Sequence, residues 1–97
     1  MIKKTKLSPS KKLLKIRKNI DRIDFKILRL LKQRREQVIQ IVKVKPKSKI
    51  VDKKRIKEMV FIRCNKARSI GLETFIVKNI WVAMIKSFIK LERKIYK

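Results

Sequence analysis

Basic side chains stand at several positions where the spacing of the apolar residues predicts a buried surface. Along residues 13–45 apolar residues recur at helical intervals, and Arg34 and Lys45 fall within that apolar arc while Arg17 lies on its flank. Arg55 stands at the edge of a further apolar face. Because a buried cation is costly without an anion beside it, these positions favour a pocket for a small, multiply negative ligand.

A carboxylate interrupts the last apolar stripe in the same manner. Glu92 falls within a stripe made of Val77, Trp81, Met84, Phe88 and Ile95. Periodicity leaves two interpretations open: an internal salt-bridge network, in which Asp24 and Glu92 neutralise the interior arginines, or a ligand site to which the acid belongs. The interior cations outnumber the carboxylates, which favours the ligand site. The aromatic residues Trp81 and Phe88 are predicted to pack in the core.

The composition excludes several kinds of catalysis and leaves one rival function. The chain has no histidine and one cysteine, so neither imidazole acid–base chemistry nor a clustered metal site is expected. Its net charge of +24 also suits a basic helical protein that binds nucleic acid. No apolar run is long enough for a membrane span, and the cysteine usage predicts a cytoplasmic location.

The N-terminal half is predicted to be one long helix. Residues 1–9 are expected to form a flexible basic tail, and residues 10–97 a single domain. Ser10 can cap a helix that continues to about Val44 or Lys45, where Pro46 stops it.

Two shorter helices are predicted in the C-terminal half. Asp52 can cap a helix over residues 53–70, and Gly71 suits the left-handed residue at its end. A last helix opens at Glu73 or Thr74 and runs nearly to the C-terminus. The predicted fold class is therefore all-α, with one long helix and two shorter ones.

The first predicted helix is longer than the body of a compact chain of this size. A helix over residues 11–44 spans about 50 Å at about 1.5 Å per residue, whereas a globule of 97 residues is about 32 Å across. The apolar row continues from Leu13 to Ile41. Two shorter helices cannot cover so much surface, so we predict an intertwined homodimer in which the long helices pack against the partner chain.

Short motifs along most of the chain are similar to those of a known family. They are RKNIDRID at residues 17–24, RRE at 34–36, Lys45, DKKR at 52–55, SIGLE at 69–73 and FIKLE at 88–92. In this order they resemble the all-helical, type II chorismate mutases. The resemblance implies an intertwined helical homodimer with two shared active sites. It also implies the rearrangement of the small dianion chorismate to prephenate, in aromatic amino-acid biosynthesis, with no cofactor and no metal.

The resemblance also implies roles for the basic residues. Arg17 would reach into the partner's site and hold one substrate carboxylate, and Arg34 would bind the other carboxylate from within its own chain. Lys45 would donate to the ether oxygen of chorismate, and Arg55 would add positive charge. A fixed cation near the ether oxygen can stabilise the negative charge that develops there.

The resemblance also implies which residues contact the substrate ring and the ether oxygen. Asp52 would lie near the ring hydroxyl, and Glu92 would hydrogen-bond the ether oxygen, for which its carboxyl must be protonated. Two positions depart from the pattern: Ile56 replaces a glutamate that helps bind the hydroxyl, and Phe88 replaces a small hydroxyl residue. Isochorismate pyruvate lyases and amino-deoxychorismate mutases resemble the chain there, so the alternative substrates stay open.

Neither specific nucleic-acid binding nor membrane association is expected.

Overall fold

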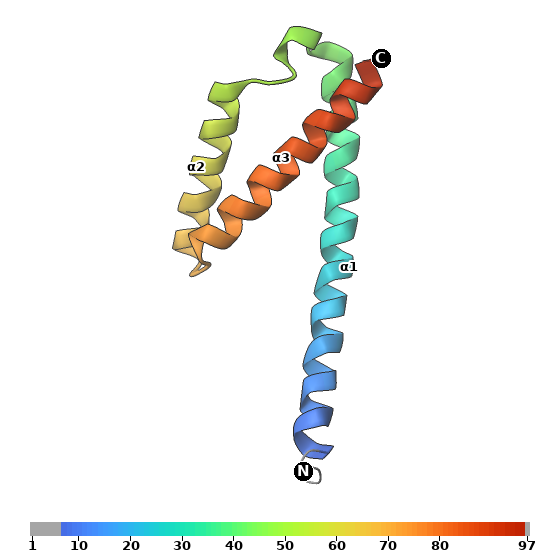
Figure 1. The fold of residues 1–97 in the computed structure, drawn as a ribbon, viewed down its shortest axis with the longest axis vertical. Helices are drawn as coiled ribbons and strands as arrows, with labels where there is room; N and C mark the ends of the chain where they lie inside the picture. The colour runs from blue at the N-terminus through green and yellow to red at the C-terminus, as the bar shows by residue number, and fades with distance from the viewer. Residues whose placement is uncertain (1–6, 97) are drawn as a thin grey trace. The chain divides into compact units, whose positions relative to one another are not determined.

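The computed structural model describes residues 7–96, and this range contains helices and no strand. Helix α1 runs over Leu7–Val44, the short 3-10 helix η1 over Lys47–Lys49, α2 over Lys53–Ser69 and α3 over Thr74–Tyr96 (Figure 1). The prediction of an all-α fold with one long helix and two shorter ones is confirmed. The chain divides into two compact units, residues 1–35 and 36–97, and α1 contributes to both.

Helix α1 begins at Leu7, earlier than the start predicted at Ser10. Pro9 stands in its first turn, where the missing N–H costs little because the first N–H groups of a helix have no internal acceptor. Of the predicted tail at residues 1–9, residues 7–9 are helical and residues 1–6 lie outside the described residues.

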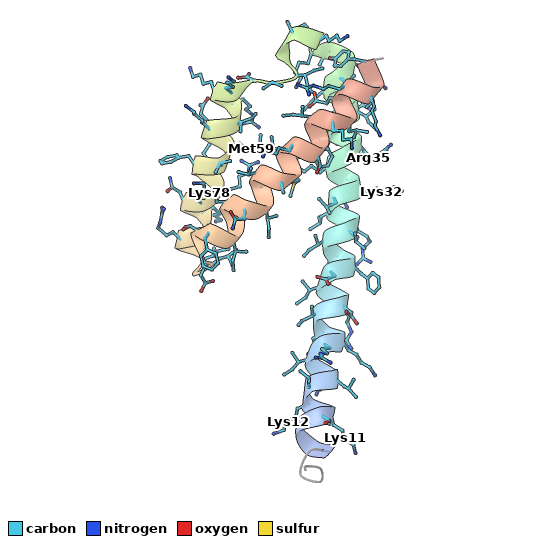
Figure 2. The ribbon with its side chains drawn as sticks, in the orientation of Figure 1. Lys11, Lys12, Lys32, Arg35, Met59 and Lys78 are labelled. Carbon is cyan, nitrogen blue, oxygen red and sulfur yellow. The ribbon has the colours of Figure 1, made fainter. Side chains whose placement is uncertain are left out.

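In the first unit, α1 exposes its apolar row. Leu13, Ile23 and Leu30 are 46%, 54% and 61% exposed. Every side chain from residue 10 to residue 30 is exposed, apolar and charged alike, and the side chains stand out around the helix (Figure 2). Leaving apolar area in water costs about 25 cal/mol per Å² that a partner surface would otherwise remove. A contiguous apolar row of this kind marks an interaction surface.

In the second unit, a small core lies between α2 and α3, which pack on each other. Met59 and Ala67 of α2 and Val77 and Ile85 of α3 are buried. Figure 2 shows Met59 directed toward α3. These residues follow the helical period of their segments, so the amphipathic pattern determines which faces meet. Ile95, predicted to continue the stripe of α3, is instead 41% exposed.

The turn between α2 and α3 follows the predicted chemistry. Gly71 adopts φ of 76°, the left-handed conformation that favours glycine at a helix C-terminus. The N–H of Leu72 donates to the carbonyl of Ala67 at 2.8 Å, and the N–H of Gly71 donates to that of Arg68 at 3.2 Å. These two bonds make a Schellman motif, which satisfies the last carbonyls of α2 and turns the chain into α3.

Candidate active site

An ion pair between the end of α1 and α3 forms the centre of the candidate site. The Nζ atom of Lys45 lies 2.7 Å from Oε1 of Glu92, and the two side chains are 25% and 8% exposed. Both residues belong to the second unit. The predicted interior position of Glu92 is confirmed, since the residue is 6% exposed. Little water reaches this pair, so its charges are weakly screened.

The buried oxygen of Glu92 already has a charged partner. Oε1 lies 2.7 Å from Nζ of Lys45, the separation of a charge-assisted hydrogen bond. Each oxygen of an ionised carboxylate has two lone pairs, so Glu92 can contact a further group while it stays paired with Lys45.

The local sequence positions Lys45 just beyond α1. The N–H of Lys45 donates to the carbonyl of Ile41 at 2.7 Å, which extends the helical pattern to this residue. Pro46 then stops the helix, because it has no N–H and its ring clashes with the preceding turn. The side chain of Lys45 therefore projects from a fixed helix end rather than from a mobile loop.

Tyr96 also contacts the end of α1, and it was not identified as a site residue from the sequence. Its hydroxyl donates to the carbonyls of Val42, at 3.1 Å, and Lys45. In a regular helix the carbonyl of Val42 would accept from residue 46, but proline has no N–H to donate. The position of Pro46, four residues after Val42, is the feature that predicts the need for an outside donor.

The residues predicted to surround the substrate ring lie at the start of α2 and on α3. Oδ1 of Asp52 accepts the N–H of Arg55 at 3.1 Å, which confirms Asp52 as the N-cap of α2. The side chain of Arg55 is exposed, whereas Ile56 and Phe88 are half-buried. The carboxylate of Asp52 therefore contacts the backbone N–H of Arg55. Among the described residues, no hydrogen bond or ion pair joins them to the Lys45–Glu92 pair.

The two predicted carboxylate-binding arginines belong to the first unit. Arg17 is exposed and Arg34 is half-buried, both on α1. Their separation in sequence corresponds to about 25 Å along a helix. A small dianion cannot reach across that distance. Arg17 and Arg34 of one chain therefore cannot bind the same ligand molecule.

The described residues contain neither a candidate metal site nor a candidate membrane-spanning helix. Between residues 7 and 96, no group of three His, Cys, Asp or Glu side chains gathers as a metal site would require. In the same range no helix combines the length and the apolar character needed to cross a membrane.

Comparison with known proteins identifies the family. The family model for chorismate mutase type II matches residues 16–93. The chain belongs to the type II chorismate mutase family. The match covers α2 and most of α1 and α3. No curated protein and no solved structure gives a significant match to the chain.

Membership of the chorismate mutase family confirms the resemblance deduced from the motifs. It supports the function of an isomerase that acts on chorismate, a small dianion of the kind that the interior cations predicted. The +24 charge suits several polyanions, but the family match favours the small ligand.

Proposed function

We propose that this chain is a chorismate mutase that converts chorismate to prephenate, with its active sites shared between the two chains of a homodimer. The observation that carries the proposal is the buried Lys45–Glu92 pair. In the family's pattern both positions serve the ether oxygen of the substrate, and the family model spans both. We further propose that the enzyme works in the cytoplasm and feeds aromatic amino-acid biosynthesis.

The reaction requires positioning and charge rather than proton transfer to the protein. Within one chorismate molecule a C–O bond breaks and a C–C bond forms, and no atom or electron is exchanged with the enzyme. The site must hold the flexible substrate in a compact conformer and stabilise negative charge on the ether oxygen. A sequence without histidine is compatible with both tasks.

Lys45 and Glu92 supply the charge stabilisation in this proposal. The ammonium of Lys45 donates to the ether oxygen as its C–O bond breaks, at a place where little water weakens the interaction. Glu92 donates to the same oxygen when its carboxyl is protonated. The burial of Glu92 beside Lys45 supports contact of both groups with the same substrate atom.

Arg17 and Arg34 bind the two substrate carboxylates from different chains. Arg34 serves the site of its own chain, and Arg17 extends into the site of the partner. The separation of about 25 Å along α1 supports this division, because one chain cannot bring both guanidinium groups to one ligand. Arginine suits the task, since its planar fork matches a carboxylate in a bidentate manner.

The exposed apolar row of the first unit supports the homodimer. Residues such as Ile20 and Ile27, at 49% and 47% exposure, lie on a face that needs a cover. The second unit offers an apolar hollow of about 360 Å³ between α2 and α3, whose lining includes Ala67, Val77 and Trp81. In the proposed dimer each chain's apolar row is covered by surfaces of its partner.

Arg55, Asp52, Ile56 and Phe88 adjust substrate recognition in the proposal. Arg55 adds positive potential, and Asp52 lies near the ring hydroxyl while it caps α2. Ile56 and Phe88 are apolar side chains where the family more often has polar ones. The alternatives of isochorismate and amino-deoxychorismate differ from chorismate in the ring substituents, so these positions decide among them.

Product analysis tests the function. The purified full-length chain is incubated separately with chorismate, isochorismate and amino-deoxychorismate, and the products are identified by chromatography and mass spectrometry. We expect prephenate from chorismate. Salicylate and pyruvate from isochorismate, without turnover of chorismate, would assign the chain to the lyase relatives.

A matched pair of arginine variants separates the enzyme from a basic nucleic-acid-binding protein. Arg34→Ala should abolish turnover, whereas Arg29→Ala, which removes an exposed cation from the same helix, should leave it nearly unchanged. A nucleic-acid-binding protein would tolerate both changes and lose affinity steeply with salt. Turnover that survives Arg34→Ala would contradict the proposed site.

A further inference from the structure

Two residues on consecutive turns of α3, Glu92 and Tyr96, contact Lys45. Glu92 and Tyr96 are four residues apart, so they lie on the same face of the helix. Glu92 contacts the ammonium of Lys45 at 2.7 Å. Tyr96 contacts the other end of the same residue, because its hydroxyl donates to the backbone carbonyl of Lys45.

The tyrosine also stabilises the helix end from which Lys45 projects. Pro46 leaves the carbonyl of Val42 without its usual helical donor, and the Tyr96 hydroxyl lies 3.1 Å from that oxygen. One hydroxyl proton is thus shared between the carbonyls of Val42 and Lys45. The contact joins residues more than fifty positions apart in the chain. Tyr96 itself is half-buried, which shields the bonds from competing water.

We propose that Tyr96 is a positioning residue for Lys45: its hydroxyl fixes the last turn of α1 against α3, so that the ammonium of Lys45 is held at the reacting oxygen. This inference rests on the proposed function, since it requires Lys45 to act on the substrate. Tyr96 acts in this proposal through the backbone carbonyl of Lys45 rather than on the reacting atoms. Its effect is on the direction of the lysine side chain, and a cation displaced by an ångström loses much of its catalytic value.

The test uses a substitution that removes the hydroxyl and keeps the ring. In full-length Tyr96→Phe we expect kcat for chorismate to fall about 10-fold, because the lysine is less well fixed. KM should stay within about twofold, since the carboxylate-binding arginines are unchanged. Ser87→Ala is the matched control: it removes a hydroxyl from α3 that bonds only within its own helix, to the carbonyl of Ala83 at 3.0 Å. It should leave both constants unchanged.

A double variant separates positioning from general stabilisation. If Tyr96 acts through Lys45, Tyr96→Phe should cause almost no additional loss of kcat in a Lys45→Gln background. An equal additional loss in both backgrounds would overturn the proposal. Circular dichroism of each variant checks that it is folded, and Tyr96→Phe with normal kcat would also overturn it.

The outcomes distinguish this proposal from the proposed function. If the wild-type chain converts chorismate and Tyr96→Phe does so equally well, the positioning role alone is wrong. If the wild-type chain does not convert chorismate, the proposed function is wrong, and the positioning role of Tyr96 in that reaction is wrong with it.

Discussion

Apolar side chains are buried in the second unit of this chain and exposed in most of the first. In residues 36–97, apolar side chains of α2 and α3 cover one another, and the charged pair Lys45–Glu92 is enclosed with them. In residues 10–30 of α1, every side chain is exposed, although the apolar row there is as regular as any in the second unit. The same amphipathic pattern therefore produces a core in one unit and an uncovered surface in the other.

Helical periodicity therefore predicts which face of a helix is to be buried, but it does not predict which chain covers that face. An apolar face gains free energy from any surface that excludes water, whether it belongs to the same chain or to a partner. The second unit contains its own covering helix. The described part of the first unit, residues 7–35, is a single helix and contains no second element to cover its apolar face.

Removing the central cation of the second unit should have the largest effect. We expect Lys45→Ala to lower kcat at least about 100-fold, because it removes the charge directed at the transition state. Lys43→Ala, at an exposed position two residues earlier, is the control and should retain activity. Steady-state kinetics with chorismate measure both. Near-normal turnover by Lys45→Ala would show that the charged pair is not the catalytic centre.

Mixing two inactive variants tests whether the first unit completes a partner's site. Arg17→Ala and Lys45→Ala should each be nearly inactive. With free exchange of chains, half of the dimers are mixed, and each mixed dimer holds one intact site and one doubly altered site. The mixture should therefore recover about a quarter of wild-type activity per chain. No recovery, with chain exchange verified by mass spectrometry, would mean that Arg17 does not cross between chains.

Glu92→Gln should preserve a donor at the ether oxygen. The amide N–H group of the new side chain donates a hydrogen bond without first binding a proton. We expect kcat of Glu92→Gln to stay within about 10-fold of wild type in steady-state kinetics with chorismate. A loss as large as that of Lys45→Ala would contradict the donor role of Glu92.

A change at the turn between α2 and α3 should have the smallest effect, on stability alone. Gly71→Ala meets no atom within 4 Å of the added Cβ, so the cost comes from its φ of 76°. We expect a loss of about 1 kcal/mol in the free energy of unfolding, measured with urea at a fixed chain concentration. The exposed Lys78→Ala serves as the control. A stability unchanged by Gly71→Ala would indicate that the turn does not require the left-handed conformation.

The helices could be predicted closely because their boundaries depend on local chemistry. Asp52 caps α2, Gly71 ends it and Pro46 ends α1, each through a property of its own backbone or side chain. The start of α1 was less predictable. The first turn of a helix accepts Pro9 without penalty, so nothing in that segment compels the helix to begin as late as Ser10.

The amino-acid sequence is sufficient to predict the helices, the apolar faces that are to be buried, and the charged residues within those faces. All three depend on the spacing of residues along one helix. It also carried the motifs of the chorismate mutase family. The family resemblance implied that Lys45 and Glu92 serve one substrate oxygen, and the structure shows the two side chains in contact. The contact of Tyr96 with the end of α1 was found in the structure alone. Both contacts join residues far apart in the chain, and periodicity within a helix contains no information about which helix ends come together.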